Sequence, residues 1–345
     1  MTWPLARVKE LGWTFMEEFT SAQATQLDIN AAQGADGSLW TDVGLMKNFT
    51  RRGVATDECH VLHWHESSRT WHRFDITATF TFAFRSFEGN DSWDATGVLA
   101  GAAPVFVEAA ASNASAIVVG ASPGVAGVGK YNVSVDSGAT WVLRNSTDSS
   151  VLGPTAICWH SGSLRFVSGL GSGLIETSDD DGTTWIARLG TSAIRAIVSS
   201  GSALIALIGL STVIRSADGI TWATIDPGVT VPGGWGSAAY NPELGQFMLA
   251  AGDGSVAISS DDGLTFTPLA PFAAIAGAIK LCAFRRMWCV LADVGSKSRL
   301  VVSTGGPWFP VAEFGAGARA LSASDQRIAV VDSDNHYYMS IAGGL

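Results

Sequence analysis

A short turn motif that recurs at a near-constant interval is the feature that most constrains the fold of this chain. The motif reads SVDSGATW at Ser134–Trp141 and SDDDGTTW at Ser178–Trp185. Shorter forms follow as SADGITW at Ser216–Trp222 and SDDGLTF at Ser260–Phe266, and a degraded copy, STGGPW, ends at Trp308. The closing aromatic residues are separated by 44, 37, 44 and 42 residues. Such a period is the length of four short strands with their turns, so the spacing predicts a repeated four-stranded unit.

Each residue type in the motif suits a tight turn between two strands. Ser and Asp two positions apart can direct their side-chain oxygens onto nearby backbone N–H groups. Gly supplies the positive φ that a tight hairpin needs, and the Trp ring packs onto the sheet. The motif Trp residues are therefore predicted to be structural anchors. Six other Trp residues are predicted to pack in the core, with a binding surface as the alternative: Trp13, Trp64, Trp93, Trp159, Trp235 and Trp288.

The pattern S-x-D-(x)-G-x-T-W resembles the Asp-box (BNR repeat), which recurs in sialidase-like and other β-propellers. In that family the motif lies at the hairpin between the third and fourth strands of a blade. The resemblance implies an all-β propeller of four-stranded antiparallel blades. At about 42 residues per blade, the 345-residue chain favours seven blades, with eight or six as the alternatives.

The remaining sequence predicts a single propeller over residues 1–345. Apolar runs broken by Gly, Asp and Ser supply the strands of five blades over about residues 104–315, within a regular region that extends over 104–345. Residues 8–103 fit the repeat poorly. They are predicted to form one enlarged blade or two irregular blades, with an inserted subdomain as the alternative.

The two ends of the chain are predicted to complete one blade together. Ser340, Gly343 and Gly344 begin a degenerate motif without an aromatic residue, and Thr2 and Trp3 carry the missing part. The sequence therefore predicts that residues 2–7 form the outer strand of the last blade, which would leave no exposed sheet edge. Under this prediction the N-terminus is part of the fold and does not serve as an export signal.

Composition disfavours two classes of partner. The formal net charge is -10, the sequence pI is about 5.0, and the basic clusters are limited to Arg51-Arg52 and Arg285-Arg286. This charge disfavours binding to nucleic-acid phosphates. No apolar run approaches the roughly 18 residues that are needed to span a bilayer.

Four cysteines are too few for a disulfide scaffold in a chain of this length. Cys282 and Cys289 flank a two-residue hairpin at Arg285-Arg286, which would place them directly opposite each other. The sequence favours two buried thiols there, with a cross-strand disulfide as the alternative.

Four of the six histidines lie between positions 60 and 72. If this segment is a hairpin centred on Ser67-Ser68, His63 and His65 share a face and His72 lies opposite His63. Imidazole suits Zn and Fe, but no further ligand is placed to complete a site. Polar histidines on an exposed hairpin are therefore expected, with a metal site as the alternative.

The acidic run Asp179-Asp180-Asp181 is predicted to be a turn. A calcium loop would need a bidentate Glu about nine residues later, where Leu189 and Gly190 stand. We accordingly expect no metal ion and no cofactor.

An enzyme of sialidase-like fold would need the catalytic set of that family, which this sequence does not match. The set comprises three Arg that clamp the substrate carboxylate, a Tyr nucleophile with a Glu partner, and an Asp acid. Only Tyr131, Tyr240, Tyr337 and Tyr338 are present, and no Glu is predicted beside any of them. No catalytic residue is therefore assigned.

The sequence favours a non-catalytic binding or structural module. Because Asp-box propellers mostly act outside cells and this chain shows no leader, we expect a bacteriophage virion component. A tail or tail-tip protein would contact host surface glycan or neighbouring tail proteins. The alternatives are a glycoside hydrolase with another carboxylate pair, and an assembly factor, for which an Arg-rich face would be expected.

Overall fold

A computed structural model describes residues 49–340 with short internal gaps. The gaps are residues 55–57, 77–80, 88–92, 100–105, 123–129, 229–230, 270, 273–278, 295–296, 306, 316, 318, 326 and 332–335. Every helix or strand element in the described part is a β-strand. Among these residues no helix is long and apolar enough to cross a membrane.

Six sheets are each formed by four strands that are consecutive in the sequence, and all their pairings are antiparallel. Their strands are β2 Glu58–His65, β3 Thr70–Ile76, β4 Thr81–Phe87 and β5 Asp94–Val98; β6 Phe106–Ser112, β7 Ile117–Ser122, β8 Tyr131–Ser134 and β9 Val142–Arg144; β10 Pro154–His160, β11 Arg165–Leu170, β12 Leu174–Ser178 and β13 Ile186–Gly190; β14 Ile194–Ser199, β15 Leu204–Ile208, β16 Thr212–Ser216 and β17 Ala223–Ile225; β18 Trp235–Asn241, β19 Gln246–Ala251, β20 Val256–Ser259 and β21 Thr267–Leu269; and β22 Ile279–Phe284, β23 Met287–Val294, β24 Lys297–Ser303 and β25 Phe309–Gly315.

A further four-stranded sheet combines strands from both ends of the described chain. Its order is β1-β28-β27-β26, with β1 at Phe49–Val54, β28 at His336–Ser340, β27 at Ile328–Val331 and β26 at Ala320–Ala323. We refer to it as the composite sheet. β26 contacts β22 on one side and β2 on the other, so this sheet lies between the last and the first of the six consecutive sheets.

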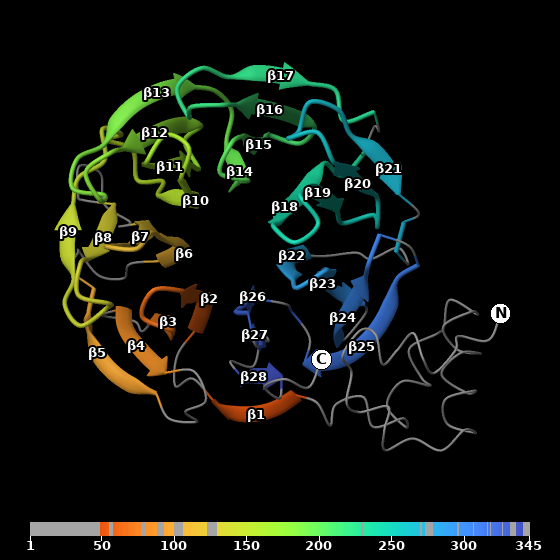
Figure 1. The fold of residues 1–345 in the computed structure, drawn as a ribbon. Coiled ribbons are helices and arrows are strands. Elements are labelled where there is room, and N and C mark those ends of the chain that lie inside the picture. The colour runs from red at the N-terminus through yellow and green to blue at the C-terminus, as the bar shows by residue number, and fades with distance from the viewer. Residues whose placement is uncertain are drawn as a thin grey trace.

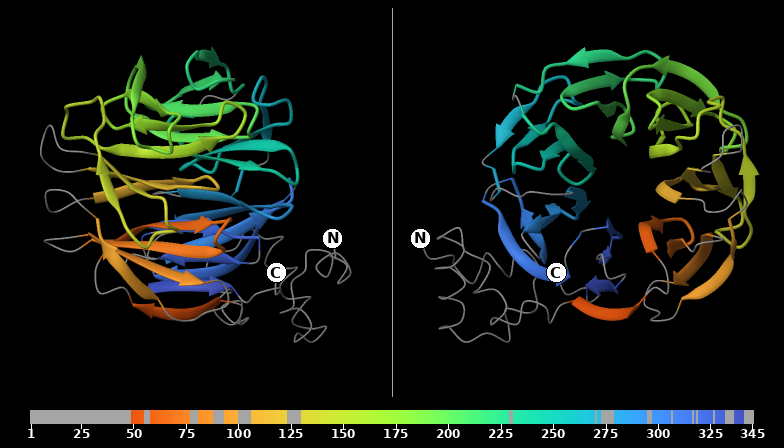
Figure 2. Two further views of the ribbon diagram at one scale, coloured as in Figure 1. Left: turned by 60° about the vertical axis from the view of Figure 1, so that its left-hand side comes forward. Right: turned by 180° about the vertical axis from the view of Figure 1, so that it is seen from behind.

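The sheets are arranged around a central axis, with the first strand of each consecutive sheet inward and the fourth outward (Figure 1). The views from the side and from behind show the same arrangement (Figure 2). The prediction of an all-β propeller of four-stranded antiparallel blades is thereby confirmed at the level of the fold.

The predicted blade assignment and the predicted closure are wrong. The sequence predicts seven blades, with the last one completed by residues 2–7. Instead, six blades consist of consecutive strands, and the outer strand of the composite sheet is β1, whose Phe49 pairs with Ser340 and whose Val54 pairs with His336. A six-residue strand without proline can offer every backbone N–H to a partner, whereas Pro4 removes one from the predicted segment. Residues 1–48 lie outside the described residues, as does the predicted degenerate motif after Ser340.

The hydrophobic core lies between neighbouring sheets. Buried apolar residues of one sheet pack against those of the next, as Ile205 and Leu207 do with Phe247 and Leu249. Because both faces of each sheet are covered in this way, strands such as β15 and β19 are apolar along almost their whole length.

Two kinds of hairpin lie on the same side of the molecule. In an antiparallel sheet, the hairpin between the first and second strands lies at the same end as the hairpin between the third and fourth strands. We call the side formed by these hairpins the hairpin face. The motif turns and the pocket described below both lie on it.

Candidate functional site

The motif turns connect the third and fourth strands of their sheets, as the turn at Ser178 illustrates. The Ser178 hydroxyl donates to Asp180 Oδ1 at 2.8 Å and accepts from the Gly182 N–H at 2.9 Å. Asp180 also accepts from the N–H and the hydroxyl of Thr184, at 2.8 and 2.6 Å. Gly182 has a φ of 82°, where a side chain would be strained. The side chains of Ser178 and Asp180 therefore accept hydrogen bonds from the backbone N–H groups of the turn.

The same contacts recur in three other turns. Ser134, Ser216 and Ser259 each donate to an Asp two residues later and accept from the N–H of the turn Gly. The fourth turn therefore starts at Ser259 and has the long form, not the short form that the sequence suggested from Ser260. Hydrogen bonds from the Thr265 hydroxyl and N–H hold the pKa of Asp261 at about 2.

The residue after the motif Asp joins neighbouring sheets. Asp181, with a φ of 56°, accepts from Asn113 Nδ2 at 2.7 Å and from the Ser115 hydroxyl at 2.9 Å, both in the hairpin of the preceding sheet. Asp262 repeats this role toward Ser200, at 2.9 Å. The acidic run is thus a turn, as predicted. Among the described residues, no group of three or more His, Cys, Asp or Glu could hold a metal ion.

The histidine hairpin has the predicted register, with His63 opposite His72. The imidazoles of His63 and His65 face the next sheet. His63 Nε2 lies 2.9 Å from Ser112 Oγ, and His65 Nε2 lies 3.1 Å from the carbonyl oxygen of Asn113. These bonds tie the hairpin between β2 and β3 to the hairpin between β6 and β7.

His72 is fully buried against the first motif turn, and His65 is buried as well, so the expectation of histidines on an exposed hairpin is wrong. Its Nε2 lies 2.8 Å from Thr70 Oγ1, while Nδ1 has no hydrogen-bond partner among the described residues. A Cβ at Gly138 would meet His72 Cε1 at 2.5 Å, so only glycine allows this close packing. Burial, and then the neighbouring His63, lower the pKa of His72 to about 2. The three histidines therefore pack and bond between sheets.

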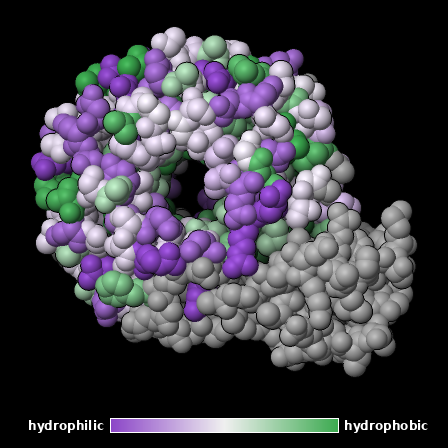
Figure 3. All heavy atoms as spheres, viewed as in Figure 1, coloured by the Kyte–Doolittle hydropathy of each residue, from purple (hydrophilic) through white to green (hydrophobic). Residues whose placement is uncertain are grey.

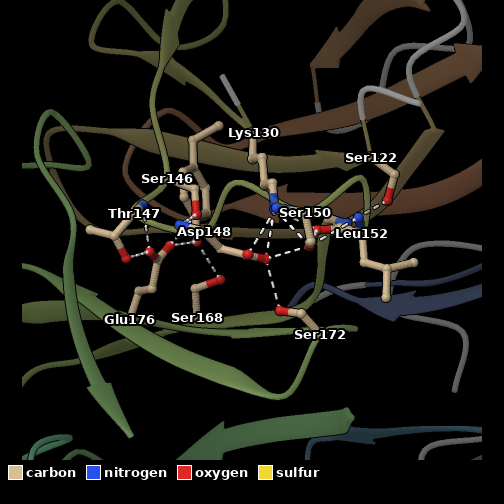
Figure 4. A network of polar contacts seen from close by, with 12 residues as sticks. Ser122, Lys130, Ser146, Thr147, Asp148, Ser150, Leu152, Ser168, Ser172 and Glu176 are labelled. Atoms are coloured by element: carbon tan, nitrogen blue, oxygen red, sulfur yellow. Dashed lines mark hydrogen bonds and ion pairs between the residues drawn. The ribbon is translucent and has the colours of Figure 1, made fainter. Parts of the chain in front are cut away.

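A buried Tyr–Glu pair includes Glu176, which lies in the polar network of Figure 4 beside Ser146 and Thr147. The Tyr131 hydroxyl lies 2.8 Å from Glu176 Oε2, so the expectation that no Glu lies beside a Tyr is wrong. Both residues are fully buried, and the Tyr131 ring stacks on Trp185 with centroids 3.8 Å apart. Glu176 also accepts from the Ser146 hydroxyl at 2.8 Å and from the Thr147 N–H at 2.6 Å. Burial, and then Glu176, raise the pKa of Tyr131 well above its usual value. A buried, protonated phenol is not placed to attack a substrate.

A buried ion pair lies beside this network (Figure 4). The Lys130 ammonium is fully buried and lies 2.8 Å from Asp148 Oδ2 and 2.7 Å from the Leu152 carbonyl oxygen. Asp148 also accepts from the Ser150 and Ser172 hydroxyls. Burial opposes ionisation of Asp148, but these donors more than offset it and hold its pKa well below the usual range. The contacts fix the connection between β9 and β10.

The hairpin face carries a pocket of about 470 Å³. Four hairpins form it, those after β2, β18, β22 and β26. Three of these hairpins belong to sheets of consecutive strands, and the hairpin after β26 belongs to the composite sheet. The lining residues are Trp64, Glu66, Pro242, Glu243, Ala283, Arg285, Ala323, Ser324 and Asp325. In the space-filling view a central opening runs into the molecule, and hydrophilic residues form part of its rim (Figure 3).

Two arginines with unusual backbone conformations flank this pocket. Arg69 has a φ of 52° and Arg285 a φ of 50°. Left-handed backbone costs a non-glycine residue about 1–2 kcal/mol, and Leu164 in the hairpin after β10 has the same conformation, with a φ of 51°, so it is a property of these turns. Arg69 pairs with Asp325 at 3.1 Å and with Glu66 at 3.6 Å, and its guanidinium lies 5.5 Å from the Trp64 ring centroid. The pocket lining therefore contains one aromatic side chain, Trp64, together with side chains of both charges.

Of the six Trp residues outside the repeated turn motif, Trp64 lines the pocket. Trp235 and Trp288 are buried in the core, which confirms the prediction for them. Trp93 and Trp159 are partly buried and pack against core clusters, whereas Trp13 lies outside the described residues. No local sequence pattern indicates the pocket, because its residues come from four distant segments.

The fold and the pocket define a β-propeller with an open, charged recess on its hairpin face. No family model matches the chain, and no curated protein is significantly similar to it. Solved propellers are similar in structure. YCF48 bound to a D1 peptide has a TM-score of 0.64 at 14% identity, over 85% of this chain and 94% of that chain.

Two further similar structures come from other propellers. The WD40 repeats of RRP9 have a TM-score of 0.66 at 12% identity, over 86% of this chain and 98% of that chain. U3-55K has a TM-score of 0.65 at 11% identity, over 85% and 98%. At such identities the similarity shows the propeller fold alone.

Proposed function

We propose that this chain is a non-catalytic protein-interaction module that binds a segment of a partner protein in the hairpin pocket. The observation that carries the proposal is the pocket itself, a recess of about 470 Å³ whose lining includes Trp64 and Arg285. Trp and Arg are enriched among residues that dominate protein–protein binding energy. The similar YCF48 propeller is itself bound to a peptide, which supports this kind of ligand.

A pocket variant should lose binding to selected peptides. Peptides would be selected from a displayed random library with the full chain as bait, and affinities measured by fluorescence anisotropy. Because Trp64 and Arg285 line the pocket, we expect Trp64→Ala and Arg285→Ala each to weaken binding by about 1–3 kcal/mol, or roughly 5- to 150-fold.

Arg286→Ala is the matched control. Arg286 is exposed on the same hairpin and has the same charge as Arg285, but it does not line the pocket. Its variant should bind as the parent does, and circular dichroism would check that all variants fold. Equal affinity of the parent, Trp64→Ala and Arg285→Ala would exclude the pocket as the site.

Within this class, we propose a bacteriophage virion component, a tail or tail-tip protein located in the particle. Its partners would be neighbouring tail proteins or host surface glycan. Support comes from the Asp-box resemblance and from an Ala- and Gly-rich, Lys-poor, acidic composition, which suits a phage of a GC-rich host.

Purified particles should contain this chain in a fixed ratio to the other tail proteins. Quantitative mass spectrometry of gradient-purified particles measures that ratio. Contaminating host proteins serve as the control, since they should fall with each purification step while this chain does not. Its loss from the purified particles would remove the virion proposal and leave the peptide-binding proposal intact.

A further inference from the structure

Two cysteines face each other across the hairpin that supplies Arg285 to the pocket. Cys282 on β22 and Cys289 on β23 are directly opposite in the register, as the sequence predicts, and both are free thiols in this structure. Cys289 is fully buried, whereas Cys282 is partly exposed. The pair lies three residues from each end of the turn at Arg285-Arg286.

The geometry of this pair meets the requirements of a disulfide. Directly opposite residues of an antiparallel pair have Cα atoms about 4.5–5.5 Å apart. A disulfide needs a Cα–Cα distance of about 4.4–6.8 Å. Directly opposite residues of a strand pair also project their side chains from the same face of the sheet, so both thiols lie on one face of this hairpin.

We propose that Cys282 and Cys289 are a disulfide site, which a small-molecule disulfide such as oxidised glutathione converts from two thiols to a cross-strand bond. The partly exposed Cys282 loses its proton, and its thiolate attacks one sulfur of the oxidant, releasing one reduced thiol and leaving a mixed disulfide. The Cys289 thiolate then attacks the Cys282 sulfur, which releases the second reduced thiol. The protein loses two hydrogens and two electrons, and the oxidant gains them.

The order of the two steps follows from burial. The neighbouring Cys282 thiol, and then burial, raise the pKa of Cys289, and Cys289 is fully buried, so the partly exposed Cys282 is the thiol that reaches the oxidant first. The bond would fasten the hairpin that carries Ala283 and Arg285, both of which line the pocket. Only this last consequence rests on the proposed function; formation of the bond does not.

The other cysteines provide internal controls. Cys158 is opposite Val167 and Cys59 is opposite Asp75, so neither has a cysteine partner across its strand pair. Burial raises the pKa of the Cys158 thiol far above its usual value, which disfavours its reaction. Both should remain thiols under conditions that oxidise the pair.

Peptide mapping of the intact chain tests the proposal directly, because trypsin cleaves between the two cysteines at Arg285 and Arg286. After incubation of the full chain with oxidised glutathione, alkylation and digestion, we expect LCAFR (residues 281–285) linked to MWCVLADVGSK (residues 287–297). The number of free thiols in the denatured protein should fall from four to two. A reducing agent should release the two peptides separately.

Cys289→Ser separates the two steps. In this variant the reaction should stop at a glutathione adduct on Cys282, and a variant Cys158→Ser should still form the linked peptides. An adduct that persists on Cys282 in the parent would overturn the proposal. Four intact thiols after prolonged exposure, or a linkage through Cys59 or Cys158, would overturn it as well.

Discussion

Glu176→Ala should destabilise the protein by about 3–5 kcal/mol, the range for removing one partner from a buried polar network. Glu176 is fully buried and accepts hydrogen bonds from Tyr131, Ser146 and Thr147. Alanine would leave the Ser146 hydroxyl and the Thr147 N–H without this buried acceptor, while the Tyr131 hydroxyl would keep only Ser168 Oγ at 2.9 Å. The loss should appear as a lower urea midpoint with an unchanged m-value.

Two comparisons make this expectation specific. Glu243→Ala removes an exposed carboxylate of the hairpin face and should change stability by no more than about 0.5 kcal/mol. Tyr131→Phe removes the hydroxyl that donates to Glu176 and should lower the free energy of unfolding by about 1–2 kcal/mol. If Glu176→Ala and Glu243→Ala have equal midpoints, the network does not hold the connection between β9 and β10.

The regular sheets could be predicted from sequence because their signal is local. Ser178, Asp180 and Thr184 lie within seven residues and make the bonds that their spacing suggests. The same holds for the histidine hairpin and for the pair Cys282 and Cys289, whose registers follow from one turn each. Short-range geometry determines these features, so a single sequence contains them.

The closing strand could not be predicted in the same way. β1 pairs with β28 across almost the whole length of the described chain, and no turn connects them. A short match between the two chain ends favoured residues 2–7 instead. Strand pairing depends on backbone hydrogen bonds that any sequence of six ordinary residues can make, so FTRRGV carries no signature of its partner.

The candidate site could not be predicted from the sequence for a related reason. Trp64, Glu243, Arg285 and Asp325 meet only because four hairpins lie on one face of the propeller. Tyr131 and Glu176 likewise come from the third strands of neighbouring sheets, 45 positions apart. The repeat period could have suggested that second contact, because residues at equivalent places of successive blades face each other.

The stability of the protein should fall steeply between pH 7 and pH 5. Burial, followed by the charge of His65, lowers the pKa of His63 to about 3, and burial lowers that of His72 to about 2. In the unfolded chain both titrate near 6.5. The folded state therefore takes up fewer protons, and its stability is fully present above pH 6.5 and decreases as the pH falls toward 3. Two such groups give a loss of about 4 kcal/mol by pH 5.

Urea midpoints measured between pH 7 and pH 5 test this expectation, because carboxyl groups with ordinary pKa values stay ionised over most of that range. His63→Gln should reduce the slope against pH by about half, whatever its effect on stability at pH 7, because glutamine does not titrate. Nuclear magnetic resonance of labelled imidazoles gives a second readout that needs no variant, since His63 and His72 should remain neutral in the folded protein at pH 5. An imidazole that titrates near 6.5 in the folded chain, or a midpoint that is constant from pH 7 to pH 5, would show that these histidines are open to water and that His63 does not bond the β2–β3 hairpin to the next sheet.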